Sequence, residues 1–211
     1  MSTASEHLFP TDHLLRSRTE RERLLGQRAL VVWMSGLSGS GKTTLANALD
    51  RRLAADGFHS FVLDGDNVRS GLNSGLGFSD HDRRENIRRV AEVSKLFVQS
   101  GMIVINAFIT PREELREMAR TIIGGGDLLE VYVEASYETC AQRDPKGLYA
   151  RVQKNAVNSF TGRDSAFEAP AHADLVLHTE SETPAESLER LYQLIRPRAS
   201  RPAGGNDSIS S

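Results

Sequence analysis

Short apolar runs alternate with longer amphipathic stretches along most of this chain. Predominantly apolar runs at 29–34, 61–63, 102–108, 128–133 and 175–177, the first of them uninterrupted, are typical of parallel strands that are covered on both faces. Between them, apolar residues recur every three to four positions, which indicates helices that pack by one face. Because strands and helices alternate, the pattern predicts a three-layer α/β fold, with a five-stranded parallel sheet and helices on both faces.

Two of the predicted helices are long and have clear ends. The stretch 43–55 carries leucine at every fourth position, and Gly57 suits the C′ position after it. The stretch 87–98 has one apolar face and is followed by Gly101. We therefore expect both helices to cover the sheet.

The pattern Thr-Pro-x-Glu occurs twice, at 110–113 and at 183–186. In each copy threonine suits the N-cap, proline the first helical position and glutamate the N3 position of a capping box. We expect a helix to begin at both places, the second running to Ile195. Thr110 is accordingly expected to cap a helix.

Composition along the chain suggests one domain with two polar ends. Residues 1–28 are polar and indicate an arm with a short helix, and 29–196 form the folded domain. Residues 144–170 lack clean periodicity, which we interpret as a mobile lid. Residues 197–211 are rich in Gly, Ser and Asn and are expected to be a disordered tail.

Charge and cysteine content narrow the range of partners. The 211 residues carry a net charge of −2, so no broad basic field favours a nucleic acid. No apolar run resembles a signal peptide or a membrane span, so we expect a cytoplasmic location and no membrane partner. Cys140 is the single cysteine, which excludes an internal disulfide, and it is expected to be a small core residue.

A phosphate-binding loop follows the first predicted strand. Residues 36–43 match G-x-x-x-x-G-K-[ST] in full, with a strand before and a helix after. The glycines allow successive backbone N–H groups to face one anion, and the helix adds its positive end. Lys42 suits the β- and γ-phosphates and Thr43 suits Mg²⁺. A guanine-reading N-K-x-D sequence is absent, since its nearest look-alike at 153–156 lacks the aspartate.

Two carboxylates follow the second predicted strand. Asp64 and Asp66 lie where the carboxyl ends of parallel strands border a ligand crevice. One could order Mg²⁺ or accept a proton from an attacking hydroxyl. An Asx-rich turn without chemistry is the alternative, because Asp, Gly and Asn favour turns in any case.

Arginines and aromatic residues nearby suit an anionic, base-containing acceptor. Arg69 and Arg83 present guanidinium forks to phosphate or sulfate oxygens, and Asn86 shares a helix face with Arg83. Phe78, in a glycine-rich loop, suits stacking on a base, whereas Phe108 suits either stacking or the core. Of Arg88 and Arg89, at least one is expected to lie on a solvated helix face.

The predicted lid begins with two cations, Arg143 and Lys146. Closing loops exclude water from phosphoryl transfer, and these side chains could complete the site when ligands bind. A solvated charged loop is the alternative.

Taken together, these residues resemble the adenylylsulfate kinase family. The similarity extends from about Arg21 to Leu177. The blocks that carry it are WMSGLSGSGKTT at 33–44, LDGDNVR at 63–69, GLN at 71–73, LGFS at 76–79, Arg83, ENIRRVAEV at 85–93, AFI at 107–109, RDPKGLY at 143–149 and FTG at 160–162.

The resemblance implies a P-loop kinase fold and a homodimer. It implies transfer of the γ-phosphoryl group of ATP, with Mg²⁺, to the 3′-hydroxyl of adenosine 5′-phosphosulfate (APS). The products are 3′-phosphoadenosine 5′-phosphosulfate (PAPS) and ADP, in sulfate assimilation. ATP would contact Gly36, Leu37, Ser38, Gly39, Ser40, Gly41, Lys42, Thr43, Thr44, Arg143 and Thr161. The acceptor would contact Asp66, Arg69, Phe78, Arg83, Asn86, Phe108, Ile109, Lys146, Gly147 and Leu148.

Catalytic roles would fall to Lys42, Asp64, Asp66 and Thr110, and the metal would be held by Thr43 and Asp64. Thr110 stands where the family usually has a serine that is often described as a phosphorylated intermediate. We favour the capping role for Thr110, because in-line transfer needs no intermediate.

Two further departures from the family pattern leave other interpretations open. Arg112 replaces the usual aromatic residue, and 150–155 lacks the more basic, glycine-containing stretch of the lid. A kinase of the same fold that acts on another small-molecule alcohol is therefore the first alternative. A non-catalytic nucleotide-binding module is the second.

Overall fold

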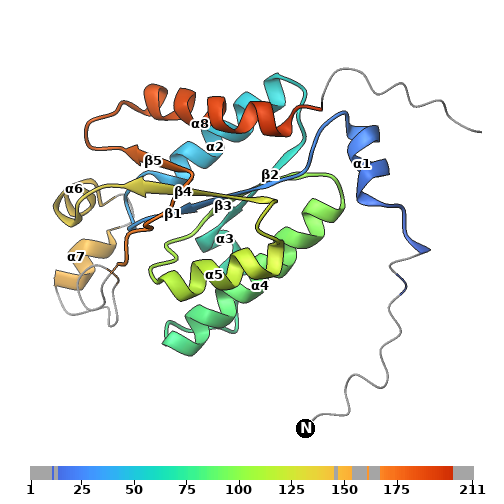
Figure 1. Cartoon of the computed structure of the whole chain (residues 1–211). Coiled ribbons are helices and arrows are strands. Elements are labelled where there is room, and N and C mark those ends of the chain that lie inside the picture. Colours follow the sequence, from blue (N-terminus) through green and yellow to red (C-terminus); the bar gives the residue numbers. More distant parts are fainter. Residues whose placement is uncertain (1–10, 12–13, 145–146, 154–160, 162–166, 202–211) are drawn as a thin grey trace, which may run out of the picture.

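The computed structural model of the chain describes residue 11 and residues 14–144, 147–153, 161 and 167–201. All five predicted strands are present in one parallel sheet, in the order β2-β3-β1-β4-β5. Helices cover both faces of this sheet, as predicted (Figure 1). The strands are β1 (Val31–Ser35), β2 (Ser60–Asp64), β3 (Ile103–Ala107), β4 (Leu128–Glu134) and β5 (Leu175–His178).

The helices form one layer on each side of the sheet. In Figure 1, α2 and α8 lie above the sheet, α4 and α5 lie below it, and α6 and α7 lie beyond one end. The helices in the described part of the chain are α1 (Arg18–Leu25), α2 (Lys42–Ala55), α3 (Gly65–Ser70), α4 (Asp80–Gln99), α5 (Glu113–Ile123), α6 (Tyr137–Arg143), α7 (Leu148–Gln153) and α8 (Pro184–Ala199).

The central strand β1 divides the core into two halves. All five of its residues are buried, and successive side chains point to opposite faces of the sheet. Val32 and Met34 pack among residues of α2 and α8. Val31 and Trp33 pack among residues of α4 and α5. An uninterrupted apolar run therefore folds as a central strand because each face has its own helical layer.

The C-terminal ends predicted for α2 and α4 are confirmed. Gly57 follows α2 in a left-handed conformation with φ of 83°, and its N–H donates to the carbonyl of Ala54. Ser79 caps α4 by accepting a hydrogen bond from the N–H of Asp82, and Gly101 follows the helix with φ of 90°. Both helices therefore stop where glycine permits the chain to turn back toward the sheet.

The capping role expected for Thr110 is wrong. Helix α5 begins at Glu113, and its N-cap Arg112 makes no side-chain cap. The carboxylate of Glu168 accepts the N–H of Glu113 at 2.7 Å instead, and the N–H of Glu168 donates to the carbonyl of Pro111. Thr110 is buried and has a φ of 42°, which an N-cap does not have. A distant carboxylate thus takes the role that local sequence assigned to Thr110.

The second Thr-Pro-x-Glu pattern does form the expected capping box. Thr183 accepts the N–H of Glu186, and the Glu186 carboxylate accepts the N–H of Thr183. The helix α8 continues to Ala199, past Pro197, whereas the sequence predicted an end at Ile195. The short α3, placed directly after β2, was not predicted, because its residues Gly65–Ser70 read as a turn.

Two smaller expectations concern Cys140 and the membrane. Cys140 lies in α6 and is fully buried, as expected for a core residue, and burial raises the pKa of its thiol. Among the described residues, the helices are too short or too polar to cross a lipid bilayer.

Replacing the α8 cap tests its contribution to stability. We expect Thr183→Ala to lower the free energy of unfolding by about 1 kcal/mol, because the N–H of Glu186 loses its acceptor. Thr183→Ser keeps the hydroxyl and should stay close to the original protein. Urea denaturation of the three proteins measures the difference, and equal stability of the alanine and serine variants would contradict it.

Candidate active site

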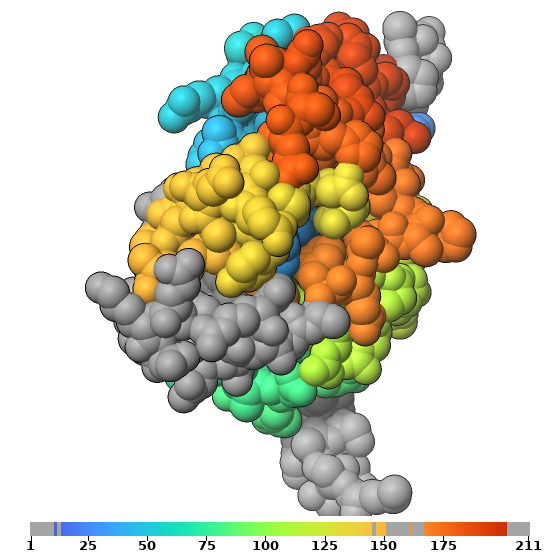
Figure 2. Space-filling view, turned by 90° about the vertical axis from the view of Figure 1, so that its left-hand side faces the viewer, coloured from blue at the N-terminus to red at the C-terminus, as the bar shows by residue number. Residues whose placement is uncertain are grey.

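A cavity of about 960 Å³ opens where the strands end. Figure 2 shows this end of the molecule, with blue atoms of the early chain visible between yellow α6 and the orange residues near β5. Such a volume is at the upper end of the range for small-ligand sites. The predicted residues that line it are Ser38, Gly39, Ser40, Gly41, Lys42, Thr43, Thr44, Asp64, Asp66, Arg69, Phe78, Arg83, Asn86, Phe108, Ile109, Thr110, Arg143, Leu148 and Thr161.

Three predicted residues lie off this cavity wall and one lies outside the described residues. Gly36 and Leu37 form the start of the phosphate-binding loop but do not line the cavity. Gly147 precedes α7 with a φ of 63° and does not line it either. Lys146 and most of the predicted lid lie outside the described residues.

Close packing shapes the phosphate-binding loop. A Cβ atom on Gly36 would lie 2.3 Å from the carbonyl oxygen of Val133, so only glycine fits against the end of β4. Gly39 and Gly41 have φ of 81° and 105°, which side chains rarely adopt. Helix α2 starts directly after Gly41, so its positive end lies at the cavity.

Lys42 folds back onto this loop. Its ammonium donates to the carbonyl oxygens of Gly36 at 2.9 Å and Leu37 at 2.6 Å, and the residue is buried. The positive charge therefore lies at the loop itself. When an anion binds, the Lys42 ammonium can donate to the anion in place of the two carbonyl oxygens, at a small cost in free energy.

Asp64 joins the two sides of the cavity. One carboxylate oxygen accepts the hydroxyl proton of Thr43 at 2.8 Å, and the other accepts the N–H of Asp66 at 3.0 Å. Asp64 is thus both the N-cap of α3 and a partner of the phosphate-binding loop. The turn-forming interpretation of this segment is confirmed by the cap, and the functional one stays a prediction that the cap does not exclude, because the second carboxylate oxygen remains at the phosphate-binding loop.

The oxygen atoms of Thr43 and Asp64 suit a hard divalent cation. Mg²⁺ is usually bound by one or two protein ligands, together with phosphates and water. No group of three or more His, Cys, Asp and Glu side chains that could hold a metal alone occurs within the described residues. A hydroxyl and a carboxylate that already meet at 2.8 Å fit a cation that arrives with a nucleotide.

An arginine-aromatic wall lies on the side of α3 and α4. The Arg69 guanidinium lies 4.5 Å from the ring centroid of Phe78, and that of Arg83 lies 5.9 Å from it. Burial lowers the pKa of both arginines, and the charge of Arg83 lowers the pKa of Arg69 further. Two partly desolvated cations side by side favour the binding of an anion.

Arg83 and Asn86 share the expected face of α4. The Arg83 guanidinium donates to the carbonyl oxygen of Phe78 at 2.9 Å and to the hydroxyl of Thr161 at 3.2 Å. Asn86 is buried and accepts a hydrogen bond from the side chain of Asn73. Thr161, which the resemblance assigns to ATP, is therefore joined here to a residue that the resemblance assigns to the acceptor.

Of the two roles that the sequence left open for Phe108, the core role is confirmed, and stacking on a base stays a prediction. Phe108 belongs to the core and stacks on Trp33, with ring centroids 6.0 Å apart, and it also lines the cavity. By contrast, Arg88 and Arg89 do not line the cavity, and both pair with Glu85 on the surface of α4. The solvated-face interpretation thus holds for both of these arginines.

Thr179 is a site residue that the sequence did not reveal. Its hydroxyl lies 2.9 Å from the carbonyl oxygen of Ser40 and 3.1 Å from that of Glu134, and Arg143 donates to it at 3.1 Å. A single threonine after β5 thereby joins the phosphate-binding loop, β4 and α6. It lacks a sequence signal because its partners are backbone groups from distant segments. Leu45, Gly65, Ile87, Leu115, Glu182, Pro184 and Ser187 also line the cavity without having been predicted.

A second unforeseen contact joins the loop to α7. The hydroxyl of Tyr149 donates to the carbonyl oxygen of Ser38 at 2.7 Å, and Tyr149 packs edge-on against Tyr137. The neighbouring Leu148 lines the cavity. The first turn of α7 is therefore fixed directly against the phosphate-binding loop.

A phosphate-binding loop before α2, facing carboxylates after β2 in a parallel sheet, defines a P-loop kinase. The chain belongs to the adenylylsulphate kinase family, whose model matches residues 28–178. This finding agrees with the resemblance drawn from the sequence motifs.

Individual relatives support the same assignment. An adenylyl-sulfate kinase of Bacteroides thetaiotaomicron is 50% identical over 192 residues, covering 91% of this chain and 96% of the relative. A probable adenylyl-sulfate kinase of Halalkalibacterium halodurans is 48% identical over 184 residues, covering 87% and 91%. The Mycobacterium tuberculosis APS kinase CysC, solved in complex with AMPPNP and APS, superposes with a TM-score of 0.77 at 39% identity, covering 80% of this chain and 98% of that one.

Removing the Thr179 hydroxyl tests whether it positions the phosphate-binding loop. Thr179→Val keeps the shape of the side chain but loses its hydrogen bonds to Ser40 and Arg143. With each bond contributing about 1 kcal/mol, we expect the dissociation constant for ATP to rise about fivefold to thirtyfold. Thr179→Ser should bind like the original protein. Calorimetric titration of ATP measures this, and unchanged affinity in the valine variant would refute the role.

Proposed function

We propose that this protein transfers the γ-phosphoryl group of ATP to the 3′-hydroxyl of APS, giving PAPS and ADP in sulfate assimilation. Family membership supports the reaction. The observation that carries it is one cavity shared by the phosphate-binding loop and the arginine-aromatic wall, with Asp64 between them. A donor phosphate and an anionic acceptor can therefore meet at the Asp64 carboxylate.

On the donor side, residues 36–44 hold the phosphates of ATP. Lys42 exchanges the carbonyl oxygens of Gly36 and Leu37 for phosphate oxygens, so its charge is in place before transfer begins. Thr43 and Asp64 hold Mg²⁺, which neutralises developing charge on the transferred group when it is bound. Arg143 and Thr161 contact ATP beyond its phosphates.

On the acceptor side, Asp66 accepts the proton of the 3′-hydroxyl as that oxygen attacks. The backbone N–H of Asp66 donates to the Asp64 carboxylate, so the chain at Asp66 is fixed relative to that carboxylate. Arg69, Arg83 and Asn86 bind the phosphosulfate group, consistent with the lowered pKa of both arginines. Since catalysis of phosphoryl transfer is mostly positioning and electrostatics, these groups suffice for direct transfer.

The acceptor adenine stacks between Phe78 and Phe108. Phe78 is 61% exposed, so its ring remains accessible to a base beside the guanidinium groups of Arg69 and Arg83. Ile109, Gly147, Leu148 and Lys146 complete the acceptor site, and the segment 144–170 acts as a lid that excludes water. The active protein is a cytoplasmic homodimer.

Direct transfer assigns Thr110 to structure instead of covalent chemistry. Its hydroxyl already accepts a hydrogen bond from the indole N–H of Trp33 at 3.0 Å, and the residue is only 2% exposed. A nucleophile requires a base to take its proton, and an indole N–H is a donor only.

A coupled assay for ADP release, with and without APS, tests the proposal. We expect turnover that depends on APS and yields PAPS. ATP turnover on another alcohol but not on APS would support the alternative acceptor, and ATP binding without any transfer would support a non-catalytic module.

Lys42→Ala should lower kcat by about 100-fold or more, because charge stabilisation of the transferred group is lost. Lys95→Ala, on the exposed surface of α4, is the matched control and should turn over normally. Near-normal kcat in Lys42→Ala would contradict the role of the phosphate-binding loop.

A further inference from the structure

Thr110 adopts a strained backbone conformation. With φ of 42° it is the one residue other than glycine, among the described residues, whose φ lies in the left-handed range above +20°. Threonine is β-branched, and such residues enter the left-handed region only where their surroundings force it. Some contact must therefore hold Thr110 in place.

Two hydrogen bonds restrain Thr110 from opposite sides. The indole N–H of Trp33, on β1, donates to the Thr110 hydroxyl at 3.0 Å. The guanidinium of Arg116, on α5, donates to the Thr110 carbonyl oxygen at 3.1 Å. Side chain and backbone are thus fixed separately, so the residue cannot rotate into an ordinary conformation without losing a buried hydrogen bond.

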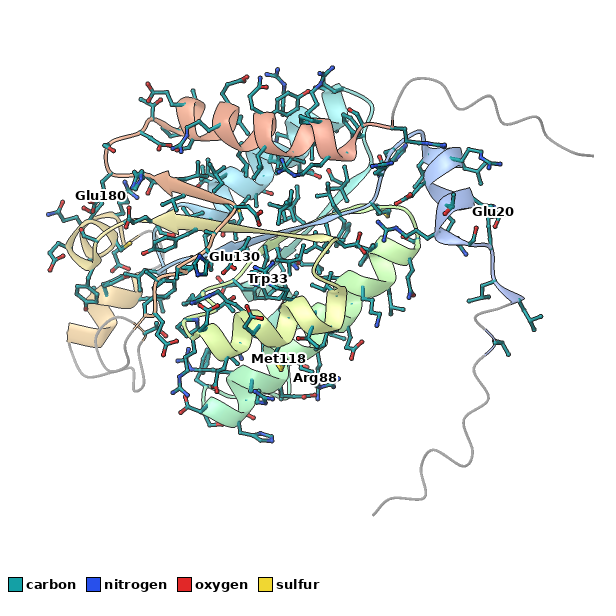
Figure 3. The ribbon with its side chains drawn as sticks, in the orientation of Figure 1. Glu20, Trp33, Arg88, Met118, Glu130 and Glu180 are labelled. Atoms are coloured by element: carbon teal, nitrogen blue, oxygen red, sulfur yellow. The ribbon has the colours of Figure 1, made fainter. Side chains whose placement is uncertain are left out.

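Two carboxylates hold the Arg116 guanidinium near Thr110. Glu113, one turn earlier on α5, accepts a hydrogen bond from it, and the buried Glu130 forms an ion pair with it. Glu130 on β4 lies 3.1 Å from Arg116 as an ion pair, in an orientation too oblique for a hydrogen bond, and also accepts from Arg120 at 2.7 Å. The side chains of Arg116 and Glu130 are 2% and 4% exposed. Glu130 and Trp33 are paired in the β1–β4 register and lie together between the sheet and α5 (Figure 3). Both restraints on Thr110 therefore arise from neighbouring positions of the sheet.

This arrangement is costly for the fold. Burial raises the pKa of Glu130, because the carboxylate loses hydration that its arginine partners do not fully replace. A buried ion pair often contributes no more to stability than apolar residues would. The ion pair with Glu130 contributes instead by orienting the Arg116 side chain toward Thr110.

The restrained residue lies at the acceptor side of the cavity. Phe108, Ile109 and Thr110 line the cavity in succession, whereas Arg116 does not. Phe108 stacks on Trp33, and the carbonyl of Ile109 accepts the N–H of Gly36 at 3.2 Å. Each residue of this segment is therefore held by a contact outside the segment: Phe108 and Thr110 by Trp33 of β1, and Ile109 by the phosphate-binding loop.

We propose that Arg116 is a positioning residue for the acceptor: anchored on Glu113 and Glu130, it holds Thr110 in the left-handed conformation and so fixes Phe108 and Ile109 in the cavity wall. The inference rests on the proposed function for the identity of the acceptor, but the restraint on Thr110 exists without any ligand.

Steady-state kinetics of matched variants test the acceptor role. In Arg116→Met the KM for APS should rise about tenfold, corresponding to release of the strained residue, while the KM for ATP stays within about twofold. Arg120→Met also removes a partner of Glu130 but has no bond to Thr110, so both KM values should stay near those of the original protein. Because glycine adopts positive φ at no steric cost, Thr110→Gly in the Arg116→Met background should return the KM for APS toward its original value.

The single tryptophan supplies a measurement that needs no substrate. Its indole N–H gives one signal in a ¹H–¹⁵N spectrum, and Thr110→Val should move that signal by removing its acceptor. Arg116→Met should move it as well, and Arg120→Met should not. If Arg116→Met does not fold, Arg116→Lys replaces it, since one ammonium cannot satisfy Glu130 and Thr110 as a fork does.

Three results would overturn the proposal: KM values for APS and ATP that rise together, an Arg120→Met variant that matches Arg116→Met, or an indole signal that Arg116→Met leaves in place. A wild-type protein that does not use APS would refute the proposed function instead, and the indole measurement would still decide the restraint on Thr110.

Discussion

The parallel direction of all five strands is the constraint on which the site depends. Parallel strands bring their carboxyl ends to one edge, so the loops that follow β1, β2, β3 and β5 meet there although they are far apart in sequence. The approach is close: Gly36 touches the carbonyl of Val133, and Thr43 reaches Asp64. Reversing β1 would remove both contacts, and reversing β2 or β4 would remove one of them, so the residues of the site would no longer border one cavity.

Most of the sheet and its two helical layers could be predicted from the sequence. The buried run of β1 and the leucine repeat of α2 are strong signals, because parallel strands covered on both faces and one-sided helices have distinct periods. The phosphate-binding loop was also visible, since its glycines and lysine have fixed spacing. Local pattern therefore suffices where each residue is determined by its near neighbours.

The parts that sequence could not predict are those fixed by distant partners. The local sequence predicts Thr110 as an N-cap. In the structure its hydroxyl instead accepts a hydrogen bond from the indole N–H of Trp33, 77 positions away, and Glu168 caps α5. Thr179 looks like an ordinary threonine, yet it binds backbone groups of the phosphate-binding loop and β4. Glu130 interrupts an apolar strand and could have been noticed, because a charge within such a run needs a buried partner.

The paired hydrogen bonds between Glu168 and residues 111–113 have a thermodynamic consequence for the chain before Glu168. They close a loop of the chain between Pro111 and Glu168. Tyr149, which lies within this loop, binds Ser38 through its hydroxyl. The conformational entropy lost in closing this loop is part of the free energy of folding. Pro111 and Leu148 both line the cavity, so a ligand that contacts both meets two points whose positions are already fixed and does not bear this entropy cost on binding.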